Sequence, residues 1–198
     1  MMYPEKINSY LSSDAEFDAL FPVPIRNLSG LHWTPLNVVQ TAAEFLAPDA
    51  SAHIIDIGAG VGKFCIAASL YSKGAFIGIE QKKNLVIAGN KVISQLGLQN
   101  VSLIHANFVS LDIIGYTGIY YYNSFHENLL PVDNMDNDDA KRSVALYDLY
   151  IAHFKCQLDA MPRGTRLATY WSSISEIPGH YKLKDIRCND LLKLFIKT

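Results

Sequence analysis

The chain has 198 residues, of which 49% are hydrophobic and 18% are charged, and its 17 Lys and Arg against 19 Asp and Glu give a formal net charge of −2. This balance excludes a strongly basic polyanion-binding protein, so we expect no strong nucleic-acid binding. No apolar run reaches the roughly 18 residues of a membrane-spanning helix, and the N-terminus lacks a signal-peptide pattern, so we expect a cytoplasmic protein with no membrane partner.

The three cysteines, Cys65, Cys156 and Cys188, stand far apart and form no C-x-x-C pair. We therefore predict no metal site and no redox pair, and we expect all three side chains to be buried as small apolar groups. The composition leaves the oligomeric state open.

Residues 1–30 are predicted to form a helical arm that lies on the main domain, residues 31–198. Within the arm, Phe21-Pro22-Val23-Pro24 interrupts any helix begun near Asp14. Thr34-Pro35 then predicts a helix start, because threonine can cap a helix and proline at the first position loses no needed hydrogen bond. The sequence leaves open whether the arm acts as a lid.

Short apolar segments with strand character alternate with helical segments from residue 53 onward. A glycine turn, 58–62, separates the first strand from the first helix, and Asn84 is the predicted cap of the second helix. The predicted strands are 53–57, 75–79, 101–105, 119–122 and 166–171, with weaker candidates at 181–186 and 191–196. The clearest helix has apolar residues in steps of three and four, namely Val144, Tyr147, Ile151, Phe154, Leu158 and Met161.

This alternation predicts an α/β fold with a doubly wound, mainly parallel sheet of the Rossmann-like kind. Such sheets bind ligands at the carboxyl ends of their strands. A polar residue stands at or just beyond the end of each of four predicted strands: Asp56, Glu80, Asn107 and Asn123. We therefore expect the functional site along this edge.

Three kinds of ligand-binding loop contain a glycine turn of this sort, and the residues around positions 58–62 distinguish between them. A dinucleotide fingerprint needs glycine where Lys63 stands, and a P-loop needs Gly and Ser or Thr where Ile57 and Phe64 stand. The remaining pattern suits a nucleoside without a pyrophosphate. Glu80 follows Asp56 at about the interval at which an acidic residue on the next strand meets ribose hydroxyls. An NAD-dependent oxidoreductase is accordingly a weaker alternative.

The run Asp56-Ile57-Gly58-Ala59-Gly60-Val61-Gly62, with Glu80 on the next strand, resembles the cofactor site of the class I S-adenosylmethionine-dependent methyltransferases. Three further features are similar to the non-SET histone-lysine methyltransferases, the disruptor-of-telomeric-silencing type, and their small prokaryotic relatives. They are the Thr34 segment, Asn107-Phe108 and Tyr122-Asn123-Ser124-Phe125. The resemblance spans about residues 26–171.

The resemblance implies an S-adenosylmethionine site with a role for each matching position. Asp56 would orient the turn or reach the ammonium through water, and Glu80 would hold the ribose. Gln81 departs from the family's apolar residue, and Asn107 departs from its acidic one. The remaining implied contacts are Thr34, Gly58, Ala59, Gly60 and Gly62 to the methionine part, and Asn107 and Phe108 to adenine. Asn107 has a second interpretation of equal weight, as a turn residue whose side chain bonds its own backbone.

Asn123 is the predicted residue nearest to the chemistry. Its side-chain oxygen could accept a hydrogen bond from an amine and direct the nitrogen lone pair at the sulfonium methyl group. Tyr122 and Phe125 could wall the site and face the cationic methyl group. His126 or Glu127 could take the proton that an amine must lose.

The predicted function is methyl transfer from S-adenosylmethionine to an amine nitrogen, on a protein lysine or a small molecule. A nucleosomal histone is disfavoured because the chain has no lysine-rich extension to grip DNA. The alternative from another class is a catalytically silent S-adenosylmethionine binder that acts as a sensor or scaffold.

Overall fold

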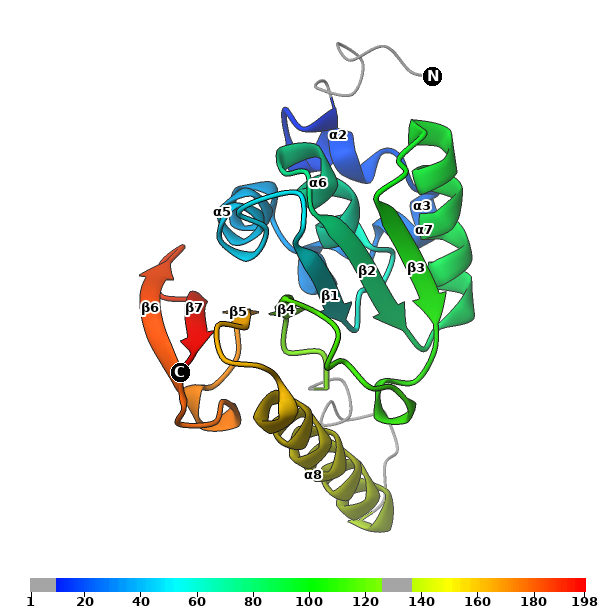
Figure 1. Ribbon diagram of the computed structural model, residues 1–198. Coiled ribbons are helices and arrows are strands. Elements are labelled where there is room, and N and C mark those ends of the chain that lie inside the picture. Colours follow the sequence, from blue (N-terminus) through cyan, green and yellow to red (C-terminus); the bar gives the residue numbers. More distant parts are fainter. Residues whose placement is uncertain (1–9, 126–136) are drawn as a thin grey trace.

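The computed structural model describes residues 10–125 and 137–198. Seven strands form a single sheet, in the order β3-β2-β1-β4-β5-β7-β6 (Figure 1). The strands are β1 (His53–Ile57), β2 (Ala75–Glu80), β3 (Val101–His105), β4 (Gly118–Tyr121), β5 (Arg166–Tyr170), β6 (Tyr181–Arg187) and β7 (Leu192–Lys197). The first five run parallel, and β7 is antiparallel to both of its neighbours. The predicted doubly wound, mainly parallel sheet is confirmed, including the two weaker strands.

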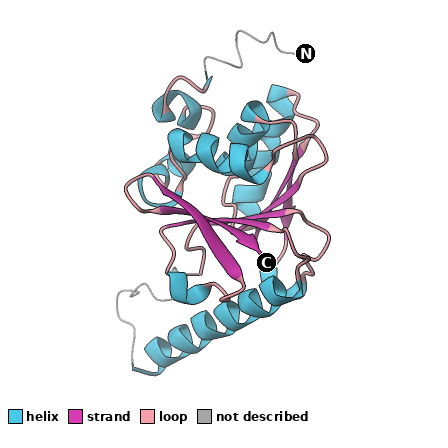
Figure 2. Ribbon diagram, turned by 60° about the vertical axis from the view of Figure 1, so that its left-hand side comes forward, coloured by secondary structure: helices cyan, strands magenta, loops and turns pink. Residues whose placement is uncertain are grey.

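Helices cover both faces of the sheet, as Figure 2 shows. One face carries α5 (Leu36–Leu46), α6 (Lys63–Tyr71) and α7 (Lys83–Leu96), while the other carries α8 (Asn137–Ala160) and the short helix η1 (Phe108–Ser110). Side chains alternate along a strand, so Ile54 joins the first core and Ile55 the second. Both faces of the parallel strands are therefore buried, which explains why these strands are almost continuously apolar.

Among the described residues, three short helices come before α5: α2 (Asp14–Asp18), α3 (Val23–Arg26) and α4 (Ser29–His32). They lie on the side of the sheet that carries α6 (Figure 1). Phe17 and Phe21 of this segment are buried in the same core as α5 and α6. Among the described helices, none is both long enough and apolar enough to cross a membrane.

Both predicted helix caps are wrong. Thr34 does not cap α5, whose N-cap is Pro35, and its hydroxyl instead lies 2.9 Å from the Tyr120 hydroxyl. Asn84 lies inside α7, which begins one residue earlier after Lys82. In each case the residue before the helix has an extended backbone and makes no side-chain cap bond of its own, and the first N–H of α5, that of Leu36, donates instead to Asp14 Oδ1 at 3.1 Å.

The structure refines the apolar stripe of α8 and corrects the predicted burial of the cysteines. Val144, at one end of the predicted apolar stripe of α8, is 50% exposed, because the buried stripe passes through Tyr150, Phe154 and Leu158. Of the cysteines, Cys65 is buried, whereas Cys156 is exposed and Cys188 is half-buried. Cys156 lies on the exposed side of α8, whereas Cys188 follows β6 and packs, half-buried, against the first core.

Candidate cofactor and active site

A cleft of about 540 Å³ opens at the carboxyl ends of strands β1 to β5. This volume lies within the range of small-molecule sites. The cleft brings together most of the predicted site residues, which lie at or just beyond the ends of the four strands β1 to β4. Nine of them line it: Gly58, Gly60, Glu80, Gln81, Asn107, Phe108, Tyr122, Asn123 and Phe125.

Four predicted cofactor residues lie elsewhere. Thr34, Asp56 and Ala59 line a second, much smaller cavity of about 20 Å³ behind the turn. Such a space holds about one water molecule. Gly62 lines neither cavity and is the N-cap of α6.

The glycine turn has the backbone that the sequence predicts. Gly58, Gly60 and Gly62 all have positive φ, of 76°, 58° and 78°, which glycine adopts without the strain of a side chain. A Cβ atom at Gly60 would meet nothing within 4 Å, whereas one at Gly58 would strike Ser124. The turn is therefore packed against the β4 loop at its start and open toward the cleft at its centre.

Glu80 is held by the backbone on both sides. Its Oε2 accepts a hydrogen bond of 2.9 Å from the Gly60 N–H, and its Oε1 accepts one of 2.7 Å from the Lys82 N–H. The side chain is buried yet lines the cleft. Each carboxylate oxygen has two lone pairs, so each can accept a second bond from a ligand hydroxyl.

Asp56 is the more deeply buried of the two carboxyl groups. Desolvation raises its pKa to about 8, the Cys65 thiol that donates to Oδ2 at 3.7 Å opposes this rise, and the charge of Glu80 adds to it. Burial likewise raises the pKa of the neighbouring Tyr120 hydroxyl well above its ordinary value. The small cavity beside Asp56 is thus polar, as a site for one ordered water or a ligand ammonium requires.

Asn107 makes the side-chain hydrogen bond to nearby backbone that is typical of a turn residue. Its side-chain Oδ1 accepts from the Val109 N–H at 3.1 Å and from the Tyr150 hydroxyl at 2.9 Å, which uses both lone pairs. Any contact with adenine would therefore come from the Asn107 Nδ2 group, as a donor. Phe108 is buried and stacks on Phe125, with ring centroids 5.7 Å apart.

Two serine hydroxyls hold the loop after β4 in place. Ser124 donates to the Ile57 carbonyl, at the end of β1, and the Asn123 N–H donates to the Ser172 hydroxyl at 3.3 Å. Asn123 has a positive φ of 42°, which is uncommon for a residue other than glycine. Tyr122 packs edge-on against Tyr170. His126 and Glu127 lie outside the described residues.

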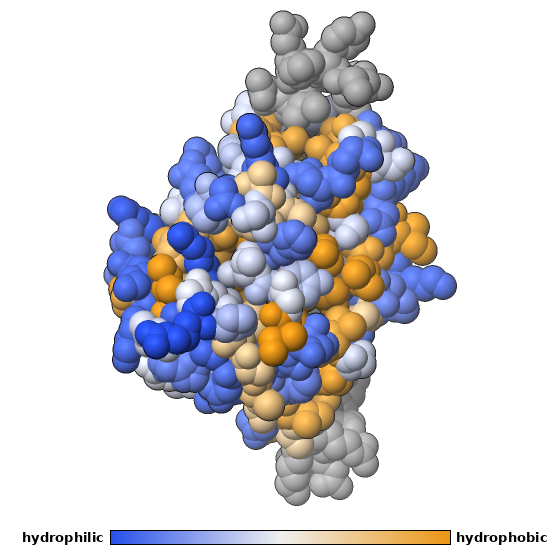
Figure 3. Space-filling view, viewed as in Figure 1, coloured by the Kyte–Doolittle hydropathy of each residue, from blue (hydrophilic) through white to orange (hydrophobic). Residues whose placement is uncertain are grey.

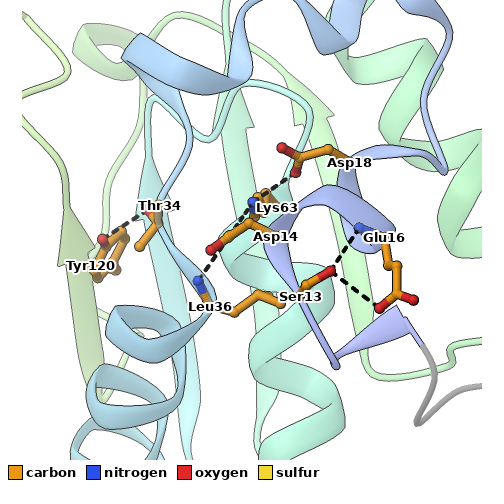
Figure 4. Close-up of polar contacts among 8 residues, drawn as sticks. All are labelled: Ser13, Asp14, Glu16, Asp18, Thr34, Leu36, Lys63 and Tyr120. Carbon is orange, nitrogen blue, oxygen red and sulfur yellow. Dashed lines mark hydrogen bonds and ion pairs between the residues drawn. The ribbon is translucent and has the colours of Figure 1, made fainter.

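Lys63 has a structural partner that the sequence analysis missed. Its buried ammonium lies 2.6 Å from Asp14 and 2.7 Å from Asp18, both on α2, as Figure 4 shows. The rings of Phe17 and Trp33 lie within 6 Å of the same ammonium. Lys63, whose presence disfavours a dinucleotide site, therefore joins α2 to the start of α6 through two ion pairs.

Several residues of the cleft were also missed, among them Trp33, Asn84, Tyr150 and Trp171. Trp171 follows β5, so the rule that ligands bind at strand ends could have indicated it. Tyr150 carried no such signal, because α8 reaches the cleft only through the packing of its middle turns on the sheet.

The part of the chain that forms the turn and its neighbouring strands matches known proteins. Residues 48–126 match a family model described as a methyltransferase domain. Over 84 residues the chain is 31% identical to a tRNA (guanine-N(7)-)-methyltransferase of Trichormus variabilis, a match that covers 42% of this chain and 39% of the relative. The chain thus spans about two fifths of the length of the curated relatives it matches.

Solved structures extend the likeness to the whole fold. An RNA methyltransferase from Salinibacter ruber in complex with S-adenosyl-L-homocysteine has a TM-score of 0.60 and 18% identity, over 83% of this chain and 91% of that one. A SAM dependent methyltransferase from Aquifex aeolicus has a TM-score of 0.53 and 15% identity, over 100% and 98%. At these identities the likenesses show a shared Rossmann-like fold.

Proposed function

We propose that this chain transfers a methyl group from S-adenosylmethionine to a nitrogen atom. Its residues 48–126 match a family model described as a methyltransferase domain. One observation carries the proposal. A single cleft places the glycine turn and Glu80 beside Asn123, so a cofactor and an acceptor can meet there. The described residues fit the cofactor, because Glu80 can accept from a ribose and Gly60 leaves open space for a ligand.

Glu80 and the glycine turn would hold S-adenosylmethionine, which would supply an activated methyl group for displacement by the acceptor nitrogen, with the electron pair of the C–S bond staying on sulfur. The chain's own residues position the acceptor. The Asn123 side-chain oxygen accepts a hydrogen bond from the acceptor N–H and so aims the lone pair at the methyl carbon. Tyr122 and Phe125 exclude water from this end of the cleft. The acceptor must be neutral to react, so a protonated amine first releases its proton to solvent.

The finer assignments rest on motifs. The likeness to the non-SET histone-lysine type depends on Asn107-Phe108 and on the segment 122–125, and it supports a nitrogen acceptor such as a protein lysine or a small amine. The names of the relatives add RNA to the acceptors to be tested. A protein that only binds the cofactor is the second candidate. The glycine turn, Glu80 and Asn107-Phe108, the cofactor half of the cleft, could bind S-adenosylmethionine without any reaction at Asn123.

Calorimetric titration with S-adenosylhomocysteine tests the cofactor half. We expect saturable binding that Glu80→Gln weakens by about tenfold or more, because a neutral amide accepts less strongly from ribose hydroxyls. Glu44→Gln, on the exposed side of α5, is the matched control and should leave the affinity unchanged. Binding of NAD in place of S-adenosylhomocysteine, or of neither ligand, would contradict the proposal.

Asn123→Ala separates an enzyme from a silent binder. The wild type is supplied with labelled S-adenosylmethionine and with total tRNA, lysine peptides or aliphatic amines. An enzyme labels one of these acceptors, and Asn123→Ala then loses transfer while its cofactor affinity changes little. A wild type that binds the cofactor and labels none of them is a silent binder.

A further inference from the structure

Trp171 is the most exposed aromatic residue that the described structure places in the cleft. Its side chain is 57% exposed, although tryptophan is one of the largest apolar residues. It directly follows β5, at the same edge of the sheet as Glu80 and Asn123. A large ring that is open to solvent inside a cleft is available for contact with a ligand.

The backbone holds Trp171 in an unfavourable conformation. Its φ is +56°, which costs free energy for a residue with a bulky side chain. The Trp171 N–H donates to the Leu191 carbonyl at 3.0 Å, and buried Ser172 donates to the Tyr170 carbonyl while accepting from Asn123. Strained positions persist where the surroundings fix them, and they cluster at functional sites. Here one serine fixes both Asn123 and Trp171.

The strand order separates Trp171 from the cofactor half. Asn107 and Phe108 follow β3, Glu80 ends β2 and the glycine turn follows β1, whereas Trp171 follows β5 on the opposite side of β4. Neighbouring strands lie about 4.8 Å apart, so β3 and β5 are about 19 Å apart. A nucleoside that reaches from Phe108 to the glycine turn leaves Trp171 to the acceptor.

We propose that Trp171 is the platform on which the acceptor stacks, and that the acceptor is a nucleobase of an RNA. This inference rests on the proposed function and names its substrate class. A flat, open aromatic face suits a planar ring, because every base can stack on it. An aliphatic lysine chain would instead need a narrow channel that shields it from water.

The charge beside Trp171 agrees with a phosphate-bearing acceptor. The β6–β7 hairpin brings two cations to this end of the sheet, because Leu192 pairs with Tyr170 on one side and with Arg187 on the other, and Lys193 pairs with Thr169. Arg187 is exposed and pairs with the half-buried Asp185 at 2.7 Å, and Figure 3 shows strongly hydrophilic side chains on the part of the surface that the hairpin occupies. Lys193 Nζ donates to the Ser172 carbonyl at 3.2 Å, next to Trp171. This local charge fits a few phosphate contacts and still agrees with weak binding to polyanions in general.

The test uses the full chain saturated with S-adenosylhomocysteine. The probes are a mixed-sequence single-stranded RNA 12-mer and total tRNA, with a lysine peptide and butylamine as the competing classes. We expect Trp171→Leu, which keeps an apolar side chain but removes the flat ring, to weaken RNA binding and to raise KM for transfer by about tenfold. Trp171→Phe should restore most of both, and Ile174→Ala, 53% exposed and outside the cleft lining, should change neither.

Cofactor affinity, measured on the same samples, distinguishes the two proposals. Every variant should bind S-adenosylhomocysteine like the wild type. A wild type that fails to bind it overturns the proposed function and this inference with it. A wild type that binds the cofactor overturns this inference alone if it methylates the peptide or the amine, if it does not bind RNA, or if Trp171→Leu binds RNA as the wild type does.

Discussion

The Lys63 ammonium lies 2.7 Å from the Asp18 carboxylate, a contact that joins α6 to a helix 45 residues earlier in the chain. Both side chains are largely buried. We expect Asp18→Asn to lower the free energy of unfolding by about 3 kcal/mol, because it leaves a buried charge with weaker compensation. Urea denaturation measures this loss.

The exposed ion pair between Arg187 and Asp185, at 2.7 Å, supplies the control. Asp185→Asn should cost less than about 1 kcal/mol, since solvent screens that pair. Equal losses of unfolding free energy in the two variants would show that burial of the Lys63 ion pair does not increase its contribution to stability.

Asp56 makes stability depend on pH. Its pKa is about 8 in the folded protein against 3.8 for the ordinary carboxyl, so between these values the folded state holds a proton that the unfolded state has released. The contribution of Asp56 to the free energy of unfolding is therefore complete below about pH 4. It is lost as the pH rises toward 8, by at most about 1.4 kcal/mol per pH unit. Asp56→Asn removes the titrating group. The difference in unfolding free energy between wild type and variant should fall as pH rises, and a difference that stays constant or grows would refute the assignment.

Gly62 is required by both its backbone and its neighbour. Its φ is +78°, and a Cβ atom there would lie 2.7 Å from Leu103 Cδ2. We expect Gly62→Ala to destabilise the protein by about 2–4 kcal/mol, from the left-handed backbone and the overpacking together. Gly97 has a similar φ of +68° with nothing within 4 Å, so Gly97→Ala should cost only about 1 kcal/mol. Thermal or urea unfolding compares the two, and similar losses would argue against the steric contribution.

Ser172 is predicted to position Asn123 through the hydrogen bond that its hydroxyl accepts. Ser172→Ala leaves the N–H of the half-buried Asn123 without that acceptor, so we expect kcat to fall by about tenfold while the affinity for S-adenosylhomocysteine stays unchanged. Ser172→Thr, which keeps the hydroxyl, should recover most of the activity. Ser173→Ala, at an exposed neighbouring position, is the control. A uniform fall in activity and cofactor affinity would indicate a general structural defect instead.

The parallel sheet could be predicted because its signals are local. Apolar runs end at Asp56 and at Glu80, and the intervening glycines allow one tight turn, so the fold class and the cofactor half of the cleft follow from neighbouring residues. The predicted cap at Thr34 was wrong because a distant residue, Tyr120, offers its hydroxyl a partner. A capping preference is weaker than such a tertiary contact.

The acceptor half of the cleft depends on contacts that no short motif records. Asn123 is fixed by Ser172, which lies 49 residues later in the chain. The backbone of Trp171 is held by a hydrogen bond to Leu191, which directly precedes β7 and lies 20 residues later in the chain. The predicted roles of the individual site residues remain predictions, because they concern ligands rather than the chain itself.

The two backbone amides that hold Glu80 have a consequence for recognition. Because Gly60 and Lys82 already fix this carboxylate, an arriving sugar meets an acceptor whose orientation was settled when the chain folded. Little rotamer entropy is then lost on association. The affinity for the nucleoside should therefore depend on how rigid the glycine turn is. Mutations elsewhere in the chain that make the turn more flexible should shorten the residence time of the bound nucleoside.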